Sequence, residues 1–308
     1  MYAYGKLLLT GEYFVLDGAL ALAMPVRFGQ RLELECPADL DSDEIRWSSK
    51  NEKGEEWFRA TWQQEAEQLV LKADNDAAIA ERLQQLFTAI QSQRADGLNA
   101  LLGVKITTQV DFPRAWGLGT SSTLVSLLAQ LTDTNPYQLL EDTFGGSGYD
   151  IACATAEGPI LYQRLGGIEV SVKDAKWQPS YQEHIYFSYL GQKQNSREGI
   201  RHYRELGGTQ PTLIDQVTEL TKDFLKANTL SEAQATLHQH EDFISEVLQM
   251  DRVQAQRFAD FPGVVKSLGA WGGDFVMILS DWPEEKVRQY FTERGCPVFF
   301  RFAEMAQS

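Results

Sequence analysis

A glycine-containing turn near the middle of the chain separates a strand-like segment from a helix-like segment. Val104 to Val110 is rich in Val, Ile and Thr, which favours a strand, and the run after the turn has leucines at helical spacing. Gly117 and Gly119 can adopt backbone angles closed to other residues and can let a ligand approach the backbone. Thr120 to Ser122 fall where the helix should begin, so we expect them to cap its free N–H groups. The stretch predicts a phosphate site, because N–H groups and the helix dipole both attract anions.

An ordinary strand-to-helix turn with an N-cap explains this stretch alone equally well. It is not a Walker A loop, because no Lys follows Gly119, and Ser122 stands where a G-x-G-x-x-G motif needs its third glycine. The segment does resemble the second motif of the GHMP kinases (galactokinase, homoserine kinase, mevalonate kinase and phosphomevalonate kinase). That resemblance implies ATP binding by Pro113, Gly117, Leu118, Gly119, Thr120, Ser121 and Ser122.

The N-terminal segment resembles the first motif of the same kinases, G-K-x-x-L-x-G-E-[HY]-x-V-L. Residues 5 to 18 read G-K-L-L-L-T-G-E-Y-F-V-L-D-G. Periodicity predicts a strand, a turn and a second strand over residues 4–16, with Lys6 at a solvated strand end. The resemblance implies instead that Lys6 lies beside the catalytic carboxylate and that Glu12 and Tyr13 face the substrate. Tyr13 is more similar to the phosphomevalonate kinase branch.

Asp150 follows a turn of three glycines and opens a run of small residues. By itself, an Asp at a helix start predicts a cap or a partner for the helix dipole. The segment Ser147-Gly148-Tyr149-Asp150, however, resembles the S-G-x-D segment of mevalonate and phosphomevalonate kinases. This implies that Asp150 is catalytic and that Ser147 and Gly148 contact the substrate. The same resemblance implies a Mg²⁺ site made by Ser121 and an upstream carboxylate, for which Glu141 is the first candidate and Asp142 the second.

The segment K-S-L-G-A-W-G-G-D, from Lys266 to Asp274, resembles the third GHMP motif, in which a glycine turn closes over the phosphates. It departs from the motif at Leu268, which replaces a hydroxyl residue, and at Trp271, which replaces a glycine. An indole there would narrow the site or stack on a ligand. The glycines implied to bind ATP are Gly269, Gly272 and Gly273.

A further polar segment follows a strand expected over residues 184–190. It resembles the part of phosphomevalonate kinases in which a strand leads into a helix. The resemblance implies that Lys193, Ser196 and Arg197 contact an anionic substrate. A solvated helix cap is at least as good an explanation of these residues.

The composition bounds the classes of function. A formal charge of −15 over 308 residues argues against nucleic acid and anionic membrane as partners, since both need a basic face. A phosphorylated small molecule is still compatible, because such a site needs only a few local cations and Mg²⁺. No apolar run is long enough to span a bilayer, and the N-terminus does not resemble a signal peptide. Three scattered cysteines favour a reducing cytoplasm.

The remaining patterns predict packing elements without a chemical role. The clearest helix spans residues 74–94, with Asp74 or Asn75 as its N-cap, and helices are also expected over 211–227, 231–250 and 283–294. A final strand is expected over 296–302. Residues 39–53 predict a hairpin or loop insertion, and the aromatic residues Trp47, Trp57, Phe58 and Trp62 are expected to pack on that surface hairpin.

Three motifs in the right order, together with the Asp150 segment, cover the chain nearly from end to end. They imply an α+β, two-domain GHMP kinase fold, with a ribosomal-S5-like α/β domain over residues 1–170 and a ferredoxin-like α+β domain over residues 171–308. The implied activity is Mg²⁺- and ATP-dependent phosphorylation of a hydroxyl or phosphate on a small acidic metabolite, most similar to mevalonate or phosphomevalonate, by a monomer or homodimer. A sugar kinase, a diphosphomevalonate decarboxylase and a nucleotide-binding paralogue are the alternatives.

Overall fold

The computed structural model describes residues 1–66, 68–192, 196–206, 210–269, 271 and 274–307, with the backbone alone at residues 196 and 197. Contacts divide the chain into two compact units. The first contains Met1–Gly5, Phe28–Arg114 and Leu118–Thr155, and the second contains Lys6–Arg27, Ala115–Gly117 and Ala156–Ser308. Whether residues 1–170 and 171–308 are separate folding domains stays a prediction.

The first unit is built on a sheet with the strand order β5-β4-β3-β6-β2. Strand β3 runs parallel to β6, and the other neighbours are antiparallel. The predicted bounds of the central strand, β6, are confirmed. The strands are β2 (Ala21–Glu35, entering this unit at Phe28), β3 (Glu44–Lys50), β4 (Glu56–Glu65), β5 (Gln68–Asp74) and β6 (Val104–Val110).

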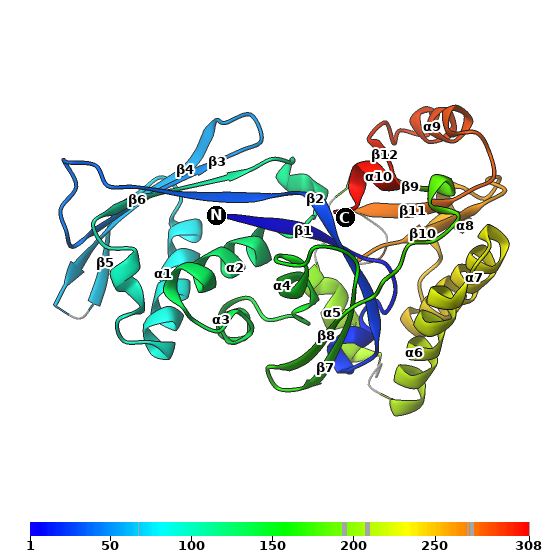
Figure 1. Cartoon of the computed structure of the whole chain (residues 1–308), viewed down its shortest axis with the longest axis horizontal. Helices are drawn as coiled ribbons and strands as arrows, with labels where there is room; N and C mark the ends of the chain where they lie inside the picture. The colour runs from blue at the N-terminus through cyan, green and yellow to red at the C-terminus, as the bar shows by residue number, and fades with distance from the viewer. Residues whose placement is uncertain (67, 193–195, 207–209, 270, 272–273, 308) are drawn as a thin grey trace. The chain divides into compact units, whose positions relative to one another are not determined.

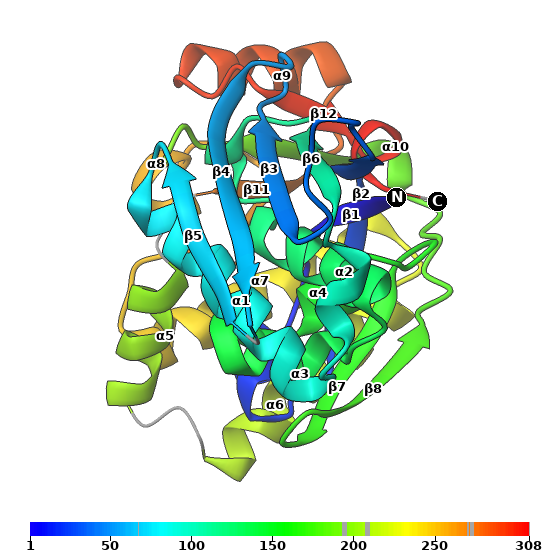
Figure 2. The same ribbon diagram turned by 90° about the vertical axis from the view of Figure 1, so that its left-hand side faces the viewer.

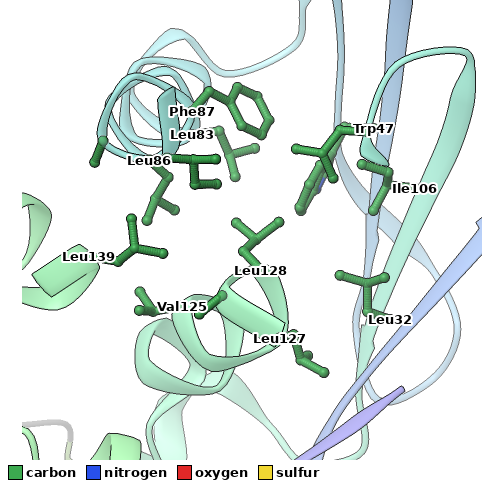
Figure 3. Packing of buried hydrophobic residues seen from close by; sticks show 14 of the residues in the cluster. Leu32, Trp47, Leu83, Leu86, Phe87, Ile106, Val125, Leu127, Leu128 and Leu139 are labelled. Atoms are coloured by element: carbon green, nitrogen blue, oxygen red, sulfur yellow. The ribbon is translucent and has the colours of Figure 1, made fainter. Parts of the chain in front are cut away.

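Helices α1 and α2 cover one face of these strands (Figures 1 and 2). Leu83 and Leu86 from α1 lie opposite Val125 and Leu128 from α2, and Trp47 and other strand residues close the cluster (Figure 3). The first helix begins later than predicted, because Asp76 is its N-cap and accepts from the N–H groups of two following residues. The helical segments are α1 (Ala77–Gln93), η2 (Gly97–Ala100), η3 (Arg114–Trp116), α2 (Thr120–Thr132), α3 (Pro136–Thr143) and α4 (Tyr149–Cys153).

The aromatic residues expected on a surface hairpin belong to this core instead. Trp47, Phe58 and Trp62 are at most 1% exposed. The expected hairpin is present, since β3 and β4 pair antiparallel, but its expected place on the surface is wrong, because β3 lies inside the sheet between β4 and β6. Alternate side chains of β3 and β4 therefore point into the helices.

The second unit contains a four-stranded antiparallel sheet with the order β10-β11-β9-β12. In chain order this is the 4-1-3-2 arrangement, with helices between the first and second strands and between the third and fourth. This is a ferredoxin-like β-α-β-β-α-β unit, as expected. The strands are β9 (Ile185–Tyr189), β10 (Val264–Ser267), β11 (Phe275–Leu279) and β12 (Phe299–Arg301).

The other strands of the second unit come from the N-terminal region and from residues 160–174. Residues 21–23 of β2 pair with β7, and β7 pairs with β8. The second strand expected within residues 4–16 is wrong, because the chain turns after β1 and forms a short 3₁₀ helix. The segments are β1 (Tyr2–Leu8, entering this unit at Lys6), η1 (Phe14–Asp17), β7 (Ile160–Gly166) and β8 (Glu169–Asp174).

Helices of the second unit cover its four-stranded sheet. The longest, α7, begins with a capping box in which Thr229 and Glu232 satisfy each other's backbone N–H groups. None of the helices described in either unit is both long and apolar enough to cross a membrane. The helical segments are η4 (Gln182–His184), α5 (Ser196–Glu205), α6 (Pro211–Lys226), α7 (Leu230–Leu248), α8 (Val253–Arg257), α9 (Glu284–Glu293) and α10 (Phe302–Met305).

Candidate functional site

The N-terminus of helix α2 has the open geometry that an anion site needs. Gly117 and Gly119 both have positive φ, at 70° and 98°, which favours glycine. Gly119 is the N-cap, and no side chain in the described part of the chain caps it. The predicted capping by Thr120 to Ser122 is wrong, because these residues lie inside the first turn. The Ser122 hydroxyl donates back to the Gly119 carbonyl at 2.8 Å. Because glycine has no side chain, the N-cap residue supplies no acceptor for the first N–H groups of α2.

A cavity of about 340 Å³ adjoins this helix N-terminus within the first unit. Thr120 and Ser121 line it, and so do three basic residues, whereas none of the described lining residues is acidic. In a chain of net charge −15, this is a local reversal of sign. The guanidinium of Arg114 lies 3.6 Å from the centre of the Trp57 ring. The basic residues are Lys50, Arg82 and Arg114.

The predicted substrate and metal residues of the first unit lie on or near two short helices. Asp150 is in the first turn of α4, half-buried, and its carboxylate accepts from the N–H of Ile151 at 3.1 Å. Gly148 is the N-cap of that helix, with φ 86°, and Ser147 precedes it. Glu141 is exposed on α3. The roles predicted for these residues stay predictions.

Gly117 is enclosed by two charged side chains of the second unit. The Lys6 ammonium donates to the Gly117 carbonyl at 2.9 Å. A Cβ atom added to Gly117 would lie 2.4 Å from a carboxylate oxygen of Asp274. The first, second and third motifs therefore each contribute one residue to this contact. A larger residue at this position would have to displace the Asp274 carboxylate, so space as well as φ favours glycine here.

Replacing Gly117 with Ala should weaken ATP binding by at least about tenfold, because the strained φ and the collision with the Asp274 carboxylate must be relieved by moving the turn or that side chain. Isothermal titration with ATP would measure the effect. Gly103→Ala is the matched control, since its φ of 69° is nearly the same but its Cβ would make only ordinary contacts, at 3.4 Å or more. Equal ATP affinity in the two variants would contradict the prediction.

A buried cluster of charges links the first and third motifs in the second unit. Lys266 ion-pairs with Glu12, and its ammonium lies 3.6 Å from a carboxylate oxygen of Glu241. All three side chains are at most 2% exposed. Burial raises the pKa of Glu12 to about 7, against the opposing effect of Lys266, and burial also raises the pKa of Glu241. Burial lowers the pKa of the neighbouring His240, so its imidazole is neutral at pH 7.

Trp271 lies in the core rather than over a ligand surface. Its indole is 1% exposed and belongs to a buried cluster that also contains Tyr13, Phe14 and Tyr203. The indole therefore has almost no exposed surface on which a ligand could stack, contrary to expectation. The rings of Tyr13 and Tyr203 stack at a centroid distance of 5.6 Å.

The remaining predicted residues are only partly described. Gly269 has φ 65° and open space beside it. Lys193, Gly272 and Gly273 lie outside the described residues, and Ser196 and Arg197 are described only as the first residues of α5. Their predicted contacts with ATP or substrate stay predictions.

Several solved structures with this arrangement of elements are kinases of small molecules. Streptococcus pneumoniae phosphomevalonate kinase, in complex with phosphomevalonate and AMPPNP, matches with a TM-score of 0.71 and 16% identity over 98% of this chain and 99% of that chain. Methanococcus jannaschii mevalonate kinase matches with a TM-score of 0.70 and 14% identity over 100% and 98%. Lactococcus lactis galactokinase matches with a TM-score of 0.67 and 12% identity over 99% and 92%. This chain has the GHMP kinase fold. No family model and no curated protein sequence matches it.

Within the GHMP kinase fold, sequence patterns found Thr120 and Ser121 but missed Arg114 and Trp57 of the cavity, and they missed Glu241 of the charged cluster. Arg114 stands inside the second motif, and its charge could have suggested a role. The sequence around Trp57 shows only the alternation of a strand and does not indicate that Trp57 lines a cavity. Glu241 did carry one, because it interrupts an apolar stripe formed by Leu237, Ile244 and Leu248 on α7. A charge inside such a stripe indicates a buried partner.

Proposed function

We propose that this protein transfers the γ-phosphoryl group of ATP to a hydroxyl or phosphate of a small acidic metabolite, most similar to mevalonate or phosphomevalonate. The observation that carries the proposal is the uncapped N-terminus of α2 beside a basic, aromatic cavity. A volume of about 340 Å³ is in the range of small-molecule sites. Trp57 supplies an apolar wall, and Lys50, Arg82 and Arg114 supply positive charge for phosphates. The GHMP kinase fold supports the same proposal.

The proposed reaction needs positioning and charge neutralisation more than covalent chemistry. The backbone N–H groups from Gly117 to Ser122 bind the triphosphate. Lys6, which donates to the Gly117 carbonyl, neutralises charge on the transferring group. Asp150 orients the acceptor and accepts its proton when the acceptor is a hydroxyl.

The residues present fit a Mg²⁺ ion only when a nucleotide supplies the other ligands. The described residues contain no cluster of three or more His, Cys, Asp or Glu that could hold a metal alone. Mg²⁺ commonly uses one or two carboxylates together with phosphate oxygens and water. Ser121 and Glu141 would hold the ion, which would neutralise charge on the phosphates.

Coupled ADP release tests the proposed activity directly. Purified protein with Mg·ATP would be assayed against mevalonate, phosphomevalonate, diphosphomevalonate, galactose and homoserine. Turnover on an acidic mevalonate-type acceptor supports the proposal, and turnover on galactose instead identifies a sugar kinase. ATP binding without turnover on any acceptor favours a nucleotide-binding paralogue. Absence of both ATP binding and turnover contradicts the proposed function.

Replacing Arg114 with Met should weaken ATP binding about tenfold, because a hydrogen bond to a charged group contributes about 1.5–3 kcal/mol. Met keeps much of the apolar stem of the side chain while it removes the guanidinium that lies over Trp57. Arg59→Met on β4 is the control, since Arg59 is exposed and pairs only at the surface with Glu56 in the described residues. The measurement is calorimetric titration with ATP. Equal affinities in the two variants would remove Arg114 from the proposed phosphate site.

A further inference from the structure

Three consecutive residues of the first-motif turn are held by three different elements of the second unit. The Thr10 hydroxyl accepts from Thr221 on α6 at 2.9 Å. The Gly11 N–H donates to Nε2 of His240 on α7 at 3.2 Å. Glu12 then accepts from the ammonium of Lys266 on β10. The position of this turn is therefore fixed by side chains that are more than 200 residues away in the sequence.

Glu241 performs the same task for the third motif. One of its carboxylate oxygens accepts from the N–H of Ser267 at 3.2 Å, and the other accepts from Nε1 of Trp271 at 3.3 Å. The second oxygen also lies 3.6 Å from the Lys266 ammonium. This single carboxylate thus contacts residues on both sides of Leu268 and Gly269, where the third-motif turn begins. A shift of the turn would break these bonds inside the core.

The charges of the cluster make the two motifs depend on each other. Glu12 and Glu241 share the ammonium of Lys266, and an ammonium buried in the core is tolerated only when it is paired. Movement of Glu12 would leave the Lys266 ammonium with its longer contact to Glu241 and its 2.9 Å bond to the Ser267 carbonyl, with no carboxylate in close contact. Movement of Lys266 would remove the buried cation from both carboxylates. The position of the first turn therefore limits the position of the third.

Trp271 explains how this chain tolerates a large residue where the motif has glycine. Its φ of 47° is unusual for a residue with a side chain, and such a conformation persists only where the surroundings determine it. Here the surroundings are the buried cluster that contains Tyr13 and Phe14, and the hydrogen bond to Glu241. The indole thus works as an anchor for the third-motif turn.

We propose that Glu12, Lys266, Glu241 and Trp271 form a buried positioning network that couples the turn of the first motif to the turn of the third. None of the four needs to touch the nucleotide for this role. The predicted effect on catalysis rests on the proposed kinase function, whereas the coupling itself does not. In this network Glu12 is a positioning residue rather than a substrate contact.

A double-mutant cycle tests the coupling without any ligand. Glu12→Gln keeps the shape of the side chain, and Trp271→Phe keeps a ring but removes the N–H donor. Glu12 and Trp271 are joined by polar contacts through Lys266 and Glu241. We therefore expect the unfolding constant of the double variant to differ at least fivefold from the value for independent effects. Urea unfolding measures all four proteins. Independent effects of the two changes would overturn the proposal.

Tyr290→Phe provides the matched control. Tyr290 lies in a different buried cluster of the same unit and donates to Asp260 at 2.6 Å, so its loss also removes an aromatic donor from a carboxylate. The changes in unfolding free energy caused by Tyr290→Phe and by Glu12→Gln should add in the double variant, as they do for independent sites. Coupling of the same size in this control would show a general loss of stability and would overturn the network.

A kinetic comparison separates positioning from mere support of the fold. Trp271→Phe should raise KM for ATP at least fivefold while kcat changes less than twofold, and Tyr290→Phe should change neither. An unchanged KM for ATP in folded Trp271→Phe would overturn the positioning role. If the unaltered protein shows no turnover with any acceptor, the kinase proposal fails, while the unfolding cycle still decides whether the turns are coupled.

Discussion

Replacing Asp150 with Asn should reduce kcat by about 10²–10⁴-fold on a hydroxyl acceptor, the range that a positioned general base contributes. The change keeps the size of the side chain and its bond to the N–H of Ile151, so α4 should keep its start. KM for ATP should change little, because Asp150 is assigned to the acceptor. Steady-state ADP release measures both constants. A much smaller loss would indicate a phosphate acceptor, which needs little help from a base.

Asp133→Asn is the control for this experiment. Asp133 is exposed at the end of α2 with φ 51°, a conformation that Asn adopts readily, and it pairs with Arg94. Its turnover should equal that of the unaltered protein. Full turnover in Asp150→Asn would show that Asp150 is not part of the reaction, and the proposed acceptor site would have to be placed elsewhere.

The sequence predicted those parts of the fold that local patterns determine. The bounds of β6 agree with the expected strand because a run of Val, Ile and Thr before turn residues is a strong local signal. Helix α6 begins at Pro211 as predicted, since proline suits a first helical turn. The order of the ferredoxin-like sheet is not local and came only from the resemblance.

Long-range packing explains the predictions that failed. The resemblance to the third motif predicted that Trp271 lies over a ligand. The indole points into the core instead, because it packs in the buried cluster with Phe14 and donates a hydrogen bond to Glu241 on α7. Likewise, nothing near Glu12 in the sequence shows that Lys266, 254 residues later, is its partner. Pairings of this kind depend on the folded arrangement of α7 and β10, which no local pattern specifies.

Replacing Lys266 with Met should lower the free energy of unfolding by about 3–5 kcal/mol at pH 8, because removal of one partner leaves buried charges uncompensated. Met fills most of the space of the lysine stem, so the loss comes from Glu12 and Glu241 rather than from a cavity. Urea unfolding measures the change. Lys222→Met removes an exposed lysine paired with Glu219 and should stay within about 0.5 kcal/mol of the unaltered protein.

The pH dependence of the stability lost in Lys266→Met shows whether the loss comes from buried charge. Burial raises the pKa of Glu12 to about 7, above its ordinary value of 4.5, so its stabilising contribution is present at low pH and is lost as pH rises through 7. Without Lys266 both carboxyl pKa values should rise further, and protonation at pH 5 should remove most of the penalty. The triple variant Glu12→Gln, Glu241→Gln and Lys266→Met should recover much of the stability at pH 8. Lys266→Met could instead lose the same unfolding free energy at pH 5 and at pH 8, with no recovery in the triple variant. That result would show that Lys266 stabilises the fold by packing rather than by charge.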